Sequence, residues 1–161
     1  MKTIIDEIIR LGNAAKERDG NDDLLSRPNL PANKAELNEL KKLFGNKISP
    51  SYTKLLSIYN GINYLDWLDV SLLSAKYLIE HPNLAEDWEI EDWGAINFKS
   101  EQLFIIGQSE NDSHLIAFDV TNSNNQKEHK VITFDSNGIL EVYENLEGYL
   151  NLRLKWFEGS F

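Results

Sequence analysis

Hydrophobic residues in the first third of the chain repeat with a helical period. A first helix is predicted after a Thr3 cap from the spacing of its apolar residues, which are Ile4, Ile5, Ile8, Ile9 and Leu11. The polar stretch 19–31, with two prolines, predicts a loop. A second helix begins at Asn33, because Asn33 with Glu36 three residues later has the form of a capping box, and Gly45 ends it.

A third helix has a clearer start. Ser49 can cap it, and Pro50 suits the first helical position because its missing N–H would have no partner there. Its apolar stripe consists of Tyr52, Leu55, Leu56 and Tyr59. Asn60 and Gly61 predict its end.

From residue 62 onward the pattern is typical of strands. Residues 62–73 mix aromatic and branched side chains and predict one or two strands, and a short helix is expected over 75–81. Four more strands are predicted over 103–106, 115–120, 131–134 and 139–143. Asn137-Gly138 predicts a hairpin between the last two, because both residues tolerate positive φ. A final helix begins after an Asn145 cap.

Helices, then short strands without helices between them, then one helix predict an α+β fold. We expect an antiparallel meander of about four to six strands with the C-terminal helix packed on the sheet. The 161 residues fit one domain. Within it, residues 1–32 form a helix and loop extension and residues 33–161 the core.

Composition restricts the environment and the chemistry. Cysteine is absent, which excludes disulfides and thiol nucleophiles and fits a reducing compartment. Acidic residues Asp6 and Glu7 come before any apolar stretch like that of a signal peptide, and no run approaches the ~18 apolar residues that span a bilayer. We therefore expect a cytoplasmic protein without membrane contact.

The chain is acidic. Sixteen basic against 26 acidic residues give a formal charge of −10, which repels nucleic acid and attracts basic proteins. The alternative is that the acidity only keeps the protein soluble.

Three stretches, in this order and spacing, resemble the SUKH superfamily. The first is 48–61, a proline-led helix with Tyr52 two residues after the proline and a terminal Asn-Gly. The second is Phe104-Ile105-Ile106-Gly107, a polar turn, then Ala117-Phe118-Asp119, and the third is 131–138 with Phe134-Asp135 before the hairpin, followed by a helix from Leu146. The resemblance covers about residues 48–155.

The chain departs from the family pattern at two places. Ser49 stands before the helix proline where the family often has Leu, and the turn 108–113 has no glycine where the family's turn is often glycine-rich. Partner contacts of other members at this turn therefore do not transfer.

The resemblance implies a binding role. The superfamily includes yeast cell-wall regulators and many bacterial immunity proteins that neutralise a toxin. We expect this chain to bind a cognate toxin, a nuclease being one candidate, and to occlude its active or substrate-binding surface. The alternative is a non-catalytic regulatory or scaffold domain.

The candidate binding surface is an acidic, tryptophan-rich segment. Its members are Glu86, Asp87, Trp88, Glu89, Glu91, Asp92 and Trp93, without a basic residue among them. Tryptophan set among carboxylates suits docking on a basic protein. The alternative is a solvated loop whose Trp side chains pack into the core. Glu110, Asp112 and Asp119 form a second candidate patch, although Asp119 has the alternative of bonding backbone at its strand end.

Catalysis finds little support in the sequence. His81, His114 and His129 have no metal-ligand spacing and are each predicted to be solvated loop residues. Neither a phosphate-binding glycine loop nor a nucleophile elbow occurs. We predict no catalytic residue, metal or cofactor; a hydrolase using paired carboxylates is the remaining enzymatic alternative. Tyr52 and Phe118 are expected in the core.

Overall fold

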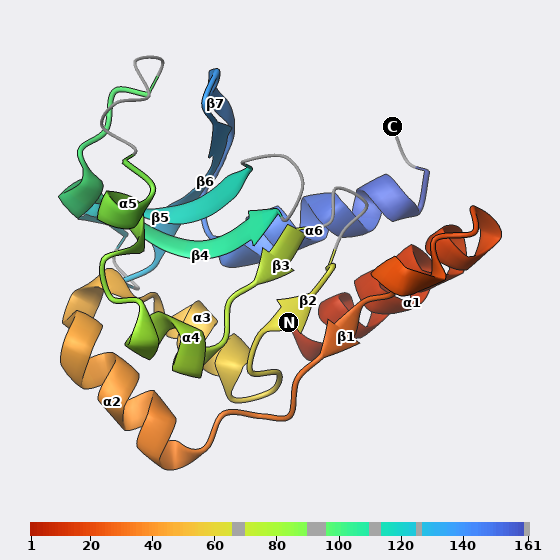
Figure 1. The fold of residues 1–161 in the computed structure, drawn as a ribbon, viewed down its shortest axis with the longest axis horizontal. Helices are drawn as coiled ribbons and strands as arrows, with labels where there is room; N and C mark the ends of the chain where they lie inside the picture. Colours follow the sequence, from red (N-terminus) through yellow and green to blue (C-terminus); the bar gives the residue numbers. More distant parts are fainter. Residues whose placement is uncertain (66–69, 90–95, 110–113, 125–126, 160–161) are drawn as a thin grey trace.

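A computed structural model describes residues 1–65, 70–89, 96–109, 114–124 and 127–159 (Figure 1). Its helices are α1 (Lys2–Arg18), α2 (Lys34–Phe44), α3 (Pro50–Leu56), α4 (Ala75–Glu80), α5 (Leu84–Asp87) and α6 (Leu146–Phe157), with 3-10 turns η1 (Asp22–Leu24), η2 (Gly45–Lys47) and η4 (Ser100–Gln102). Its strands are β1 (Arg27–Pro28), β2 (Ile62–Asn63), β3 (Val70–Leu72), β4 (Leu103–Ser109), β5 (Leu115–Ser123), β6 (His129–Asp135) and β7 (Gly138–Tyr143). They form one antiparallel sheet in chain order, which confirms the α+β prediction.

The sheet has seven strands rather than the predicted four to six. The difference lies in β1, whose Arg27 and Pro28 pair with Asn63 and Ile62 of β2 inside the stretch predicted to be loop. Two residues are too few to leave a period-two pattern in the sequence. Proline fits at this edge of the sheet, where its missing N–H interrupts no ladder.

The capping box that was predicted for α2 is present. The Asn33 side chain accepts hydrogen bonds from the amides of Ala35 and Glu36, and the Glu36 carboxylate accepts one from the Asn33 amide at 2.9 Å. Gly45 ends the helix with φ +55°, a conformation that glycine adopts at little cost. The sequence therefore specifies both ends of α2.

Three helices cover one face of the sheet. Phe104, Phe118, Val131 and Tyr143 are register neighbours across β4 to β7, so their side chains share a face. Phe44 of α2 meets Phe104 at a ring-centroid distance of 4.8 Å, and Tyr52 of α3 meets Phe118 at 5.8 Å. On β7, Tyr143 meets Tyr149 of α6 at 5.3 Å. Tyr52 and Phe118 are fully buried, as predicted.

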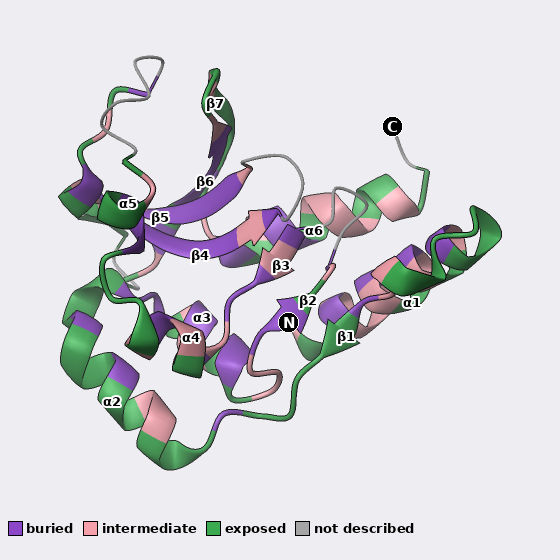
Figure 2. Cartoon of the chain, in the orientation of Figure 1, coloured by how far each residue is buried: buried purple, intermediate pink, exposed green. Residues whose placement is uncertain are grey.

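The N- and C-terminal helices lie side by side at one end of the molecule, whereas α5 contacts β4 at the other (Figure 1). Gly12 allows α1 and α6 to approach closely, since a Cβ there would lie 3.3 Å from the Phe157 ring. Strands β4 to β6 are mostly buried, whereas β7 presents exposed residues along its length (Figure 2). Among the described residues, none of the helices has the length and apolar character required to cross a membrane.

Candidate functional site

The described part of the acidic segment begins on α5, which is anchored by two apolar side chains. Leu84 and Ala85 are buried, and α5 packs against β4. The amides of Glu86 and Asp87 donate to the carbonyl oxygen of Asn83 at 2.8 and 2.9 Å. Both carboxylates therefore stand exposed on a short, well-anchored turn of helix.

Trp88 lies between the core and the surface. Its side chain is half-buried and packs against the hydrophobic core, and its amide donates to the carbonyl oxygen of Leu84 at 3.1 Å. Glu89 follows, exposed and with φ +49°. The Trp88 side chain therefore packs partly into the core, as the alternative predicted. Three exposed carboxylates, those of Glu86, Asp87 and Glu89, lie within two residues of it.

Five of the predicted site residues lie outside the described residues, namely Glu91, Asp92, Trp93, Glu110 and Asp112. Their part in a binding surface stays a prediction. Asp119 of the second patch is described: its carboxylate accepts hydrogen bonds from the amide and the hydroxyl of Thr121 at 2.9 and 2.5 Å. Asp119 therefore shapes the backbone of β5, the alternative that was expected for it.

Two hollows near these elements differ in size and charge. The cavity beneath α5 has a volume of about 80 Å³, well below the ~300 Å³ at which small-molecule pockets begin. A groove of about 630 Å³ lies between α2, α3 and the end of β5, and its charged lining residues are Lys41 and Lys127. The positive charge of these two lysines repels a basic partner, so the acidic surface of α5 suits such a partner better than this groove does.

His129 is not a solvated loop residue, and that prediction was wrong. It is 3% exposed, because β6 begins at residue 129 rather than at 131 and carries the ring beneath η2. Its Nε2 lies 2.6 Å from the carbonyl oxygen of Asn46, and its Nδ1 lies 3.3 Å from that of Asn122. The shorter of the two contacts fits an N–H at Nε2 that donates to the carbonyl oxygen of Asn46. His129 thus fastens β6 to η2.

The other two histidines lie nearer the surface. His81 is exposed, as predicted, and stacks on Tyr77 at 4.4 Å, and His114 is half-buried. In the part of the chain that the structure describes, no three His, Asp or Glu side chains form a group that could hold a metal ion.

Strand β7 is a surface that the sequence did not single out. Ile139, Leu140 and Val142 are 43%, 46% and 55% exposed. The signal in the sequence is the adjacent pair Ile139-Leu140, where strict alternation would have placed one polar residue. The register shows the cause: Glu141 pairs with Thr133 and Ile139 with Phe134, which leaves Leu140 in a β-bulge.

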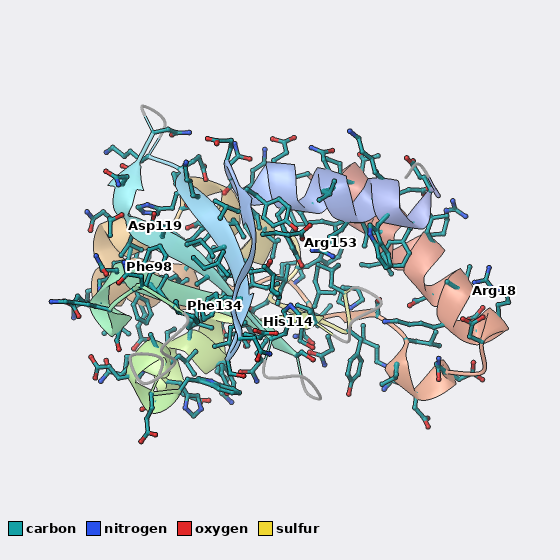
Figure 3. The ribbon with its side chains drawn as sticks, turned by 90° about the horizontal axis from the view of Figure 1, so that it is seen from above. Arg18, Phe98, His114, Asp119, Phe134 and Arg153 are labelled. Atoms are coloured by element: carbon teal, nitrogen blue, oxygen red, sulfur yellow. The ribbon has the colours of Figure 1, made fainter. Side chains whose placement is uncertain are left out.

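A polar cluster fixes β7 to α6. Tyr143 donates a short hydrogen bond to the Glu141 carboxylate, and an Arg153 Nη2 lies 2.9 Å from both the Glu141 carboxylate and the Tyr143 hydroxyl. Arg153 extends from α6 toward the strands (Figure 3) and lies over the Tyr149 ring at 5.2 Å. Burial, and then the Glu141 carboxylate, raise the pKa of Tyr143 to about 12. The hydroxyl therefore keeps its proton and donates to Glu141.

None of the curated proteins with which the chain was compared matches it. A family comparison does give a match, and it includes α2, α3, the acidic turn of α5 and the sheet from β2 to β7. The model of the SMI1 / KNR4 family (SUKH-1) matches residues 31–152, most of the chain, and the protein therefore belongs to this family.

Proposed function

We propose that this protein is an immunity protein that binds a cognate bacterial toxin and covers its active or substrate-binding surface, without catalysing a reaction. Membership of the SUKH-1 family carries the proposal, because bacterial members of the superfamily are mostly immunity proteins. Neutralisation then takes place in the cytoplasm, where the toxin acts.

The charge of the chain supports a basic partner. A net charge of −10 favours approach to a basic domain. Glu86, Asp87 and Glu89 are exposed beside half-buried Trp88, which offers an apolar contact among carboxylates. If the toxin is a nuclease, these carboxylates occupy the basic groove that otherwise binds phosphates.

Where a toxin domain is encoded immediately upstream of this gene, that domain is the partner used in the test. Purified toxin activity is measured at increasing ratios of this protein, and calorimetry gives the stoichiometry. We expect activity to vanish near one equivalent, with the toxin covalently intact, and we expect co-expression to restore growth. Absence of binding, or inactivation of many toxin equivalents by one molecule, overturns the proposal.

A regulatory scaffold domain is the second candidate, because the superfamily that the chain resembles includes yeast cell-wall regulators as well as immunity proteins. A scaffold binds its partner and leaves the partner's activity intact, so the same titration separates the two functions. An isolated gene favours the scaffold, whereas a multidomain toxin gene immediately upstream favours immunity.

A further inference from the structure

One part of this acidic chain is positively charged. Residues 40–65 contain four lysines and no acidic residue, whereas the whole chain carries a formal charge of −10. A second stretch without acids, 120–127, ends at Lys127. The structure brings the two stretches together around the groove of about 630 Å³, which we name the lysine groove. Its described lining residues include Lys41, Asn46, Ile48, Pro50, Ser123 and Lys127.

The lysines of the groove have no acidic partner within the described residues. Lys41 and Lys127 are exposed, and their side chains take part in none of the ion pairs or hydrogen bonds found there. Lys54, also exposed, comes four residues after Pro50 and lies on the same side of α3. On α2, Glu39 comes two residues before Lys41 and is therefore about 200° away around the helix axis. Three positive charges are thus available to a ligand.

Two other acids lie near these lysines along the chain, and neither neutralises the groove. Glu128 follows Lys127, but its half-buried carboxylate already accepts hydrogen bonds from the Ser51 amide and hydroxyl at 2.9 and 2.5 Å. Asp119 is the next residue after Phe118, whose ring meets α3, so the Asp119 side chain lies on the opposite face of β5. Even with the full charge of Glu128 counted, the three lysines leave the groove positive.

The groove combines an apolar floor with fixed walls. Ile48 is 7% exposed and Pro50 is exposed at the start of α3. The buried His129 ring holds two of the walls together, since its Nε2 lies 2.6 Å from the carbonyl oxygen of Asn46 in η2 and its Nδ1 lies 3.3 Å from that of Asn122 in β5. A groove that is held in shape before a ligand arrives lowers the entropy lost on binding.

The groove also offers hydrogen-bonding groups. The Asn46 side chain and the Ser123 hydroxyl belong to exposed residues and make no hydrogen bond among the described residues. An amide and a hydroxyl can each donate to and accept from the backbone of an extended peptide. The described lining residues include no aromatic side chain on which a nucleic-acid base would stack.

We propose that the lysine groove binds an acidic peptide segment of another protein, in which Asp or Glu residues flank an apolar side chain. The carboxylates pair with Lys41, Lys54 and Lys127, and the apolar side chain lies on Ile48 and Pro50. This second surface has the opposite charge to the acidic turn of α5, and it does not depend on the proposed function. Nucleic acid fits less well, because a chain with a net charge of −10 repels a long polyanion.

The test measures binding of a fluorescent peptide, Glu-Leu-Glu-Leu-Glu, by anisotropy. One double variant, Lys41→Glu with Lys127→Glu, reverses two charges at the groove. The control, Arg27→Glu with Lys155→Glu, reverses two exposed charges on β1 and α6 and has the same net charge. We expect the groove variant to weaken Kd by roughly tenfold or more and the control to change it by less than about twofold. Lys41→Gln with Lys127→Gln removes the charges without reversing them and should give an intermediate loss.

Two further ligands test the chemistry of the site. The neutral peptide Gln-Leu-Gln-Leu-Gln and a short single-stranded oligothymidylate should both bind much more weakly than the acidic peptide. The inference is overturned if the wild-type protein does not bind the acidic peptide, if the two charge-reversal variants bind it equally well with their circular dichroism unchanged, or if the oligothymidylate binds as tightly. Because the toxin takes no part in this assay, a failure here is distinct from a failure of the proposed function.

Discussion

The Tyr52 hydroxyl donates a hydrogen bond to the carbonyl oxygen of Leu73, 2.7 Å away, in a site where the Tyr52 side chain is fully buried. The carbonyl oxygen of Ile106 lies 3.0 Å from the same hydroxyl but also receives the Leu73 amide at 2.9 Å. The Tyr52 hydroxyl is therefore the hydrogen-bond donor for the carbonyl oxygen of Leu73. It ties α3 to the chain that leaves β3 and to β4.

Replacing this hydroxyl should lower stability without changing the fold. Tyr52→Phe keeps the ring and its contact with Phe118 but leaves the Leu73 carbonyl oxygen without its donor. We expect the free energy of unfolding to fall by about 1–2 kcal/mol, measured by urea denaturation. Tyr77→Phe is the control and should cost less, because the Tyr77 side chain is half-buried and its hydroxyl makes no hydrogen bond among the described residues. Equal losses in the two variants would contradict this role of Tyr52.

The start of α3 depends on a carboxylate from a distant part of the chain. Glu128 accepts hydrogen bonds from the Ser51 amide and hydroxyl at 2.9 and 2.5 Å. Glu128→Ala should therefore lower the free energy of unfolding by about 1 kcal/mol, the usual value of a helix cap. Glu128→Gln retains one acceptor and should lose less. Alanine at the exposed Glu17 should leave the urea midpoint nearly unchanged.

The hydrogen bonds at the start of α3 could not be predicted from the local sequence. Ser49 was predicted as the cap, and it does hold the N-cap position, but its side chain makes no cap hydrogen bond there. Its hydroxyl instead accepts the His129 amide at 3.0 Å. Because the residues concerned are 80 positions apart in the sequence, their pairing depends on tertiary packing, which helical spacing and cap preferences do not describe.

The hairpin between β6 and β7 was predicted from Asn137-Gly138, and it is present. The turn residues are Ser136 and Asn137, since Asp135 pairs with Gly138, and Gly138 alone of the predicted pair has positive φ. The Asp135 carboxylate accepts the Asn137 amide at 2.7 Å and holds this turn. The preference of Asn-Gly for turns thus located the hairpin. The hydrogen bond from the Asn137 amide to the Asp135 carboxylate holds the turn one residue earlier than predicted, at Ser136 and Asn137.

Gly61, which ends the predicted third helix, has φ +85° and stands against backbone. A Cβ at this position would lie 2.9 Å from the Leu72 carbonyl oxygen and 2.9 Å from the Ser74 amide nitrogen. Gly61→Ala should lower the free energy of unfolding by about 2–4 kcal/mol, from backbone strain and a clash with atoms that cannot move aside. Gly20→Ala has a similar φ of +74° and no atom within 4 Å, so it should cost only about 1 kcal/mol. Thermal melting of both variants measures the difference, and equal losses would exclude the clash.

Tyr143 should make stability depend on alkaline pH. Its pKa is raised from 10.0 to about 12 in the folded chain, so the unfolded chain loses this proton first as pH rises. The contribution of Tyr143 to the free energy of unfolding is complete below pH 10, declines as the pH rises from 10 to 12, and is lost above pH 12. Burial raises the pKa of Tyr52 as well, and Tyr143→Phe should therefore reduce the alkaline loss without abolishing it. Parallel curves of unfolding free energy against pH for the two proteins would contradict this.

The candidate site was predictable in part, for a physical reason. The contrast of Trp88 with its acidic neighbours is a local feature, and the described residues keep the carboxylates exposed, as solvation of charge requires. The exposure of Ile139, Leu140 and Val142 on β7 depends on the strand order and on the bulge at Leu140, and both follow from how the whole sheet assembles. Composition alone could not separate Val142, exposed at the edge, from Val131, which is fully buried one strand away.

The acidic turn of α5 should act mainly on the rate of association. One triple variant removes three exposed charges beside Trp88, through Glu86→Gln, Asp87→Asn and Glu89→Gln. The control variant removes three exposed charges at the opposite end of the molecule, near Arg18 (Figure 3), through Glu17→Gln, Asp22→Asn and Asp23→Asn. Both triple variants have the same net charge, so only position distinguishes them. At low ionic strength the first set should slow association with the toxin domain by about tenfold and the second by much less, because screening limits steering to nearby charges. Stopped-flow rates at about 1 M salt should converge; identical rates for the two variants at low salt would mean that net charge alone, and not the α5 turn, guides the encounter.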